Sequence, residues 1–94
     1  MTVQIVKLPV TGPRFAHDLV AIELNVHPCD APTFVVFNRR ANQVENEITQ
    51  RRDGFHVHHV YGDGDRSKAY AVRPTLDTAL ALCVAELEAD YSTP

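Results

Sequence analysis

The stretch AYAVRPTLDTALALCVAELEADY, residues 69–91, decides the fold class of this chain. A short strand-like run ends at Arg73-Pro74, and an amphipathic helix is predicted just beyond it, over about residues 75–90. Thr75 is a favourable N-cap, and Asp77 places negative charge in the first turn, where the helix dipole favours it. Apolar residues then recur at helical spacing, which predicts that one stripe of the helix covers one face of a sheet. The stripe consists of Leu76, Ala79, Leu80, Cys83, Val84, Leu87 and Tyr91.

Several strand-like runs precede the helix, and turn signals separate some of them. The run 19–27 alternates with period two, with its larger apolar residues at one parity, a pattern typical of a half-buried strand ending at Pro28. The run 33–37 is apolar at both parities, which predicts a central strand or one covered on both faces. Other strands are expected from Val3 to Leu8, over 55–61 and over 67–73, with turns at Asp53-Gly54 and at 62–65.

Residues 43–50 fit two structures. Val44 and Ile48 are spaced as on one helix face, but in a strand they would share one face, with Glu45, Glu47 and Thr49 on the other. The turn signal just beyond this segment favours a strand paired with the run 55–61, and a short helix is the alternative. The predicted fold is therefore α+β. It has a mostly antiparallel sheet of four to six strands packed on one C-terminal helix, in a single domain over residues 1–94.

The composition is that of an ordinary globular domain. The chain has 94 residues, of which 45% are hydrophobic and 22% charged, and this argues against a disordered or fibrous protein. No apolar run approaches the roughly 18 residues of a membrane span, and the first residues lack the pattern of a secretory leader. We therefore expect a cytoplasmic protein without membrane association. Cys29 and Cys83 are too few for a disulfide scaffold, so we expect both to be reduced.

The clustered histidines are the first candidates for chemistry. His56 and His58 project from the same face of the predicted strand, so both could reach one ion. His27 and Cys29 form a second group of potential ligands, and zinc accepts both histidine nitrogen and cysteine sulfur. The chain has neither a C-x₂-C pair nor an H-E-x-x-H motif, so solvent-facing histidines on a polar sheet face are the favoured interpretation. A zinc site or metalloenzyme built on these four residues is the first alternative hypothesis.

Two arginine pairs flank the 43–50 segment. Arg39-Arg40 and Arg51-Arg52 carry guanidinium groups that suit phosphate, and aromatic residues on a sheet could stack nucleic-acid bases. If 34–40 and 43–52 are sequential strands, the two pairs lie near opposite ends of one strand. The net charge of −3 and the carboxylates between the cations oppose nucleic-acid binding. A nucleic-acid interface is therefore the second alternative, and a solvated mixed-charge surface is favoured.

The leading hypothesis follows from the surface that this fold leaves uncovered. One helix cannot cover both faces of a four- to six-stranded sheet. The run 33–37 is apolar at both parities, so we expect both of its faces to be covered. A homodimer, formed through the open face or an edge strand, would supply that cover, and so would a partner protein. No catalytic motif, phosphate loop or calcium loop is evident in the sequence. We therefore expect a small non-enzymatic protein-interaction module, accessory or inhibitor-like, that needs no cofactor.

Overall fold

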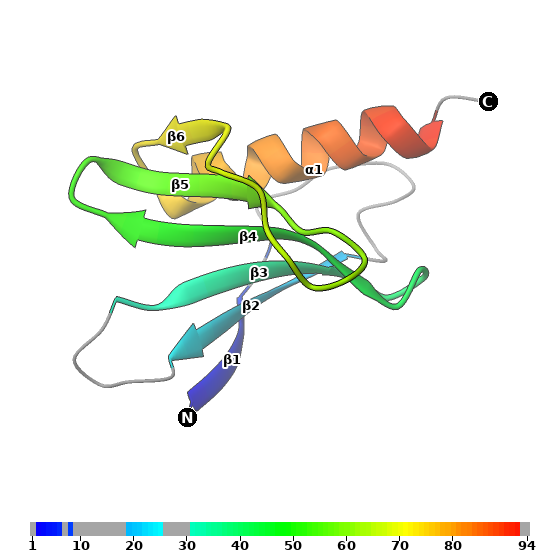
Figure 1. Ribbon diagram of the computed structural model, residues 1–94, viewed down its shortest axis with the longest axis horizontal. Helices are drawn as coiled ribbons and strands as arrows, with labels where there is room; N and C mark the ends of the chain where they lie inside the picture. The colour runs from blue at the N-terminus through cyan, green and yellow to red at the C-terminus, as the bar shows by residue number, and fades with distance from the viewer. Residues whose placement is uncertain (1, 7, 9–18, 26–30, 93–94) are drawn as a thin grey trace.

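The structure, a computed structural model, describes residues 2–6, 8, 19–25 and 31–92. These residues form a six-stranded antiparallel sheet followed by one helix, so the predicted α+β class is confirmed (Figure 1). The strands are β1 (Thr2–Val6), β2 (Leu19–Asn25), β3 (Thr33–Asn38), β4 (Gln43–Arg51), β5 (Gly54–His59) and β6 (Ala71–Arg73). The helix is α1 (Leu76–Ser92). In the described part of the chain, no helix is long and apolar enough to cross a membrane.

The sheet is a meander in which spatial order follows chain order from β1 to β6. Residues 43–50 lie within β4, which confirms the strand prediction and removes the helical alternative. The run that is apolar at both parities forms β3, one of the two central strands, as predicted. The turn signals at Asp53-Gly54 and at 62–65 both mark turns in the structure.

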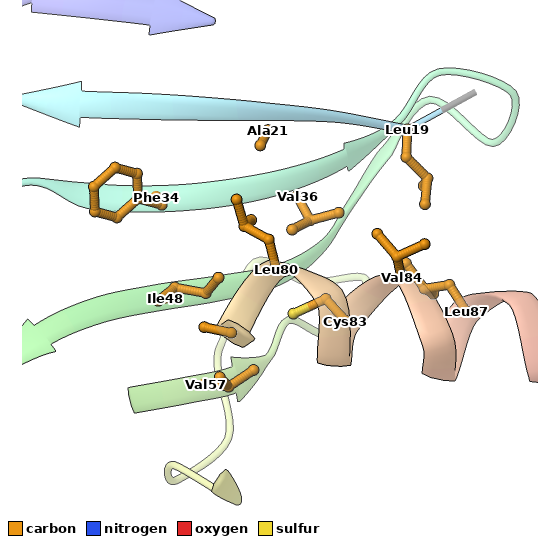
Figure 2. Packing of buried hydrophobic residues seen from close by; sticks show 11 residues of the cluster. Leu19, Ala21, Phe34, Val36, Ile48, Val57, Leu80, Cys83, Val84 and Leu87 are labelled. Carbon is orange, nitrogen blue, oxygen red and sulfur yellow. The ribbon is translucent and has the colours of Figure 1, made fainter. Parts of the chain in front are cut away.

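The apolar stripe of α1 packs from Leu76 to Leu87 against one face of the sheet, which we call the helix face. The Tyr91 side chain lies outside the described part of the structure. Figure 2 shows Leu80, Cys83 and Val84 directed from the helix toward side chains of β2 to β5. Burial of these side chains supplies most of the favourable free energy of a domain this size. The buried cluster comprises Leu19, Ala21, Phe34, Val36, Ile48, Val57, Ala79, Leu80, Cys83, Val84 and Leu87.

Thr75 caps the helix as predicted. Its side-chain oxygen accepts a hydrogen bond from the backbone N–H of Thr78 at 3.2 Å, and its carbonyl accepts one from Ala79 at 3.1 Å. The backbone N–H of Thr75 donates in return to the Thr78 hydroxyl at 3.3 Å, so two otherwise unpaired donors at the helix start are satisfied reciprocally.

A β-bulge overturns one expectation about β4. The register between β3 and β4 shifts after Val36, so Ile48 pairs with Phe34 whereas Val44 pairs with Phe37. Phe34 and Phe37 have opposite parity in β3, so Val44 and Ile48 lie on opposite faces of the sheet. The prediction that they share one face was wrong because the extra residue of a bulge reverses the alternation beyond it.

The first and last strands are shorter than expected. Leu8 lies outside β1, although it is partly buried against the core cluster. The last strand was predicted over 67–73. At its predicted start, the Ser67 carbonyl accepts a hydrogen bond from the His58 ring, and the Ser67 hydroxyl accepts one from the His59 backbone N–H. Side-chain groups therefore make hydrogen bonds with backbone groups that a regular strand would pair with backbone. The regular strand begins only at Ala71.

Candidate functional site

The sheet face opposite α1, which we call the open face, carries an apolar platform. The strand register aligns its large apolar side chains in rows across β1 to β4. These side chains are half-buried apart from that of Ile5, which is 73% exposed. An apolar sheet face that the domain's own helix does not cover is typical of an interaction site. The platform residues are Ile5, Val20, Ile22, Leu24, Val35, Phe37 and Val44.

A groove of about 570 Å³ adjoins the platform near the turn after β5. Val35 and Val44 of the platform line it together with Val60 and Tyr61. The Tyr61 side chain is 55% exposed, so it presents a large amphipathic ring at a hollow that polar side chains, among them Gln43 and Glu47, also line. The groove therefore extends the platform from a flat sheet surface into a concave one.

The loop 60–68 borders this groove and is tied to the open face. Arg66 donates a hydrogen bond to the Glu47 carboxylate at 2.7 Å, in an ion pair that joins the loop to β4. The Tyr61 backbone N–H donates to the Asp65 carbonyl at 2.8 Å, and the Asp65 N–H donates to the Asp63 side chain at 3.0 Å. These bonds close the turn on itself and hold Tyr61 at the groove.

His58 lies beneath this loop and is only 7% exposed. Its Nδ1 is 3.0 Å from the Ser67 carbonyl oxygen, which only accepts, so Nδ1 carries a proton. Its Nε2 is 3.1 Å from the Thr49 hydroxyl. Both ring nitrogens thus have partners within the protein, and the histidine fastens the loop to the sheet rather than facing solvent.

His56 shares the open face with His58 but has a different partner. Its Nε2 donates to the Asp53 carboxylate at 2.7 Å across the β4–β5 hairpin. Among the described residues, no three His, Cys, Asp or Glu side chains lie close enough to hold one metal ion. His27 and Cys29 lie outside the described residues, so the zinc site of His56, His58, His27 and Cys29 stays a prediction.

The contact between His56 and Asp53 makes a pH-dependent prediction. The hydrogen bond from His56 lowers the pKa of the Asp53 carboxyl below its ordinary value of 3.8. A depressed pKa in the folded state stabilises the protein above pH 3.8, and this contribution is lost as the pH falls through the folded-state value. In NMR titrations, His56→Asn should move the Asp53 pKa back up toward 3.8. The matched variant His59→Asn should leave it unchanged, and an equal shift in both variants would contradict the assignment.

The four arginines are exposed and lie at opposite ends of β4. Arg39 and Arg40 occupy the turn between β3 and β4, whereas Arg51 and Arg52 lie at the β4–β5 hairpin. A nine-residue strand separates the pairs by about 30 Å at the usual rise of about 3.3 Å per residue. These four arginines therefore form neither a single phosphate site nor a continuous basic patch.

A polar cluster beneath α1 was not expected from the sequence. Asn46 is 3% exposed and donates to the Tyr70 hydroxyl at 3.2 Å, and that hydroxyl donates to the Glu86 carboxylate at 2.8 Å. The His59 ring stacks on Tyr70 with centroids 4.1 Å apart. Burial, followed by the bond to Glu86, raises the pKa of the Tyr70 hydroxyl. The cluster joins three parts of the chain: β4, α1 and the segment that precedes β6. These parts are far apart in the sequence, so the spacing of the residues could not predict the cluster.

Cys83 is a fully buried core residue, as the sequence predicted. Burial, reinforced by the nearby Glu86 carboxylate, raises the pKa of its thiol to about 12. Because the thiolate is the nucleophilic form, Cys83 is inert at neutral pH.

Over the described residues, the fold and site define a small α+β domain with a helix on one sheet face and an apolar platform across β1 to β4 on the other. No protein-family model matches the chain, no curated protein is significantly similar to it, and no solved structure matches it.

Proposed function

We propose that this protein is a small non-enzymatic interaction module that binds a protein, either a partner or a second copy, through its open face. The observation that supports the proposal most is the apolar platform on the side of the sheet away from α1. Seven large apolar side chains meet there, listed above, and Ile5 among them is 73% exposed. Covering such a surface gains hydrophobic free energy at about 25 cal/mol per Å² of apolar area removed from water.

The groove beside the platform supplies the second feature of a protein interface. Interfaces centre on buried aromatic and aliphatic anchors surrounded by polar groups that exclude water. Tyr61 is half-exposed beside the valine side chains of the groove, and the ion pair between Glu47 and Arg66 lies at the same border. This arrangement supports a contact with an apolar centre and a polar rim.

The two alternatives have less support. The zinc hypothesis needs His58 as a ligand, but both of its ring nitrogens have hydrogen-bond partners in the protein. The nucleic-acid hypothesis needs Arg39-Arg40 and Arg51-Arg52 to act together, but β4 holds the pairs at opposite ends. A cytoplasmic location stays a prediction from the sequence.

The proposal is tested with a polar-face variant, Val20→Thr/Ile22→Thr/Val35→Thr. Threonine keeps the β-branched shape that suits a strand but places a hydroxyl on each platform position. We expect this variant to fold, to show the circular dichroism of the wild type, and to lose association by at least about tenfold, or about 1.4 kcal/mol. Association is measured as recovery of a partner from an affinity column, with the partner identified by mass spectrometry. Analytical ultracentrifugation records the oligomeric state of each variant.

The matched control is Ala81→Ser/Ala85→Ser, which adds hydroxyls to exposed positions on the outer side of α1. It should associate as the wild type does. Partner binding that survives in the folded polar-face variant, or a wild type that neither self-associates nor retains any partner, would overturn the proposal.

A further inference from the structure

The two outer strands of the described sheet differ in how they present their free edges. β6 has three residues, is followed by Pro74, and has its Val72 carbonyl bonded by the Arg73 guanidinium at 3.0 Å. Short length, charge and proline are the devices that block pairing at a sheet edge. β1 has five residues with the sequence TVQIV and carries neither a charge nor a proline, and Lys7 follows it directly. At the edge farthest from β6 and α1, β1 is therefore the strand suited to further pairing (Figure 1).

β1 is also complementary to itself. When a strand pairs with its own copy in antiparallel fashion about a two-fold axis, one residue meets its own counterpart. If the axis passes through the centre of β1, Gln4 lies opposite Gln4 of the partner subunit. Ile5 then pairs with Val3 of the partner subunit. Every pair in this register is uncharged, and two exposed glutamine side chains can hydrogen-bond across the axis.

We propose that two copies of this chain pair antiparallel through β1, with Gln4 on the two-fold axis, to form a continuous twelve-stranded sheet. The exposure of Ile5 supports pairing at this edge. Its side chain is 73% exposed at the end of the row that continues through Ile22 and Val35. Pairing at β1 extends this row into the partner subunit and removes the most exposed apolar side chain of the platform from the molecular edge.

This inference rests on the proposed function, because the pairing joins two open faces into one surface of twice the width. A platform of that width presents two grooves, one from each subunit, related by the same two-fold axis. The dimer therefore binds a symmetric or repeated protein partner with both subunits, and divalent binding raises apparent affinity without any new contact.

The test exchanges charge at the two-fold axis. Gln4→Lys and Gln4→Glu each place like charges opposite one another in the homodimer, whereas a mixture of the two variants pairs opposite charges. Gln4 is exposed, so both variants should fold, with Gln4→Glu the less stable because Gln4 pairs with Glu23 of β2 in the same subunit. By native mass spectrometry and ultracentrifugation, we expect a wild-type dimer, self-association weakened at least about tenfold in each variant, and a heterodimer in the equimolar mixture. Ala81→Lys, on the outer side of α1, should dimerise as the wild type does.

Three results would overturn the pairing: a monomeric wild type, variants that dimerise unchanged, or a mixture that stays monomeric. The polar-face variant separates this outcome from failure of the proposed function. If the wild type is monomeric but still binds a partner that the polar-face variant loses, the β1 pairing fails and the proposed function stands. If the charge exchange behaves as expected while the polar-face variant changes no association, the pairing stands and the open face is not the contact surface.

Discussion

Gly54→Ala is expected to lower the free energy of unfolding by about 3 kcal/mol, a large fraction of the stability of a small domain. Two features of the position act together. Its φ of +134° is a conformation that residues with a side chain rarely adopt. A Cβ at this position would also lie 2.6 Å from the Arg73 carbonyl oxygen, a backbone atom of the neighbouring strand. Relief of that clash requires β5 and β6 to move apart.

The other glycines of the next turn separate the two causes. Gly64 has a φ of +90° but open space around its Cβ position, so Gly64→Ala tests the backbone conformation alone. Gly62 has open space and an ordinary φ, so Gly62→Ala should be close to neutral. Urea unfolding of the three variants should rank them Gly54, Gly64, Gly62 in order of destabilisation. Equal effects at Gly54 and Gly64 would show that the approach of β6 contributes nothing.

Leu80→Ala is the second large effect, with an expected loss of about 3 kcal/mol. Leu80 is fully buried and lies at the centre of the contact between α1 and the sheet (Figure 2). Truncation removes apolar contacts and leaves a cavity between rigid elements that cannot collapse to fill it.

Leu82→Ala is the matched control, because Leu82 is on the same helix but is only partly buried against the cluster. The same chemical change should therefore cost about 1 kcal/mol, since less apolar surface returns to water. Chemical denaturation of both variants measures the difference. Similar losses at the two positions would mean that α1 does not pack on the sheet through the Leu80 side.

Local signals account for the parts of the fold that were predicted. The helix was predicted from the cap at Thr75, the charge at Asp77 and the apolar stripe. These features involve residues within a few turns of one another, so the sequence shows them directly. The Asp53-Gly54 turn signal likewise resolved residues 43–50 as a strand. The strict alternation in the run 19–27 correctly indicated β2, and the apolar run 33–37 correctly indicated a central position in the sheet.

Less of the candidate site could be predicted from the sequence. The sequence indicated that one face would remain uncovered, because it contained only one helix for a broad sheet. The groove at Tyr61 depends on the loop 60–68 returning to β4 through Arg66 and Glu47, a contact between residues 19 positions apart. The partner of His58 in that loop also arises from folding, so a histidine expected at the polar surface is buried.

The sequence by itself determined the kind of each element, its caps and turns, and the existence of two faces on every strand. Which face meets the helix was decided by the tertiary structure. In β2, Val20 and Ile22 lie on the open face, whereas Leu19 and the small Ala21 are buried under α1. Alternation specifies two sides but does not say which one packs, and a small residue such as Ala21 lets the helix approach the sheet closely. The bulge after Val36 then places Val44 on the open face and Ile48 in the core, because one extra residue exchanges the two sides of a strand.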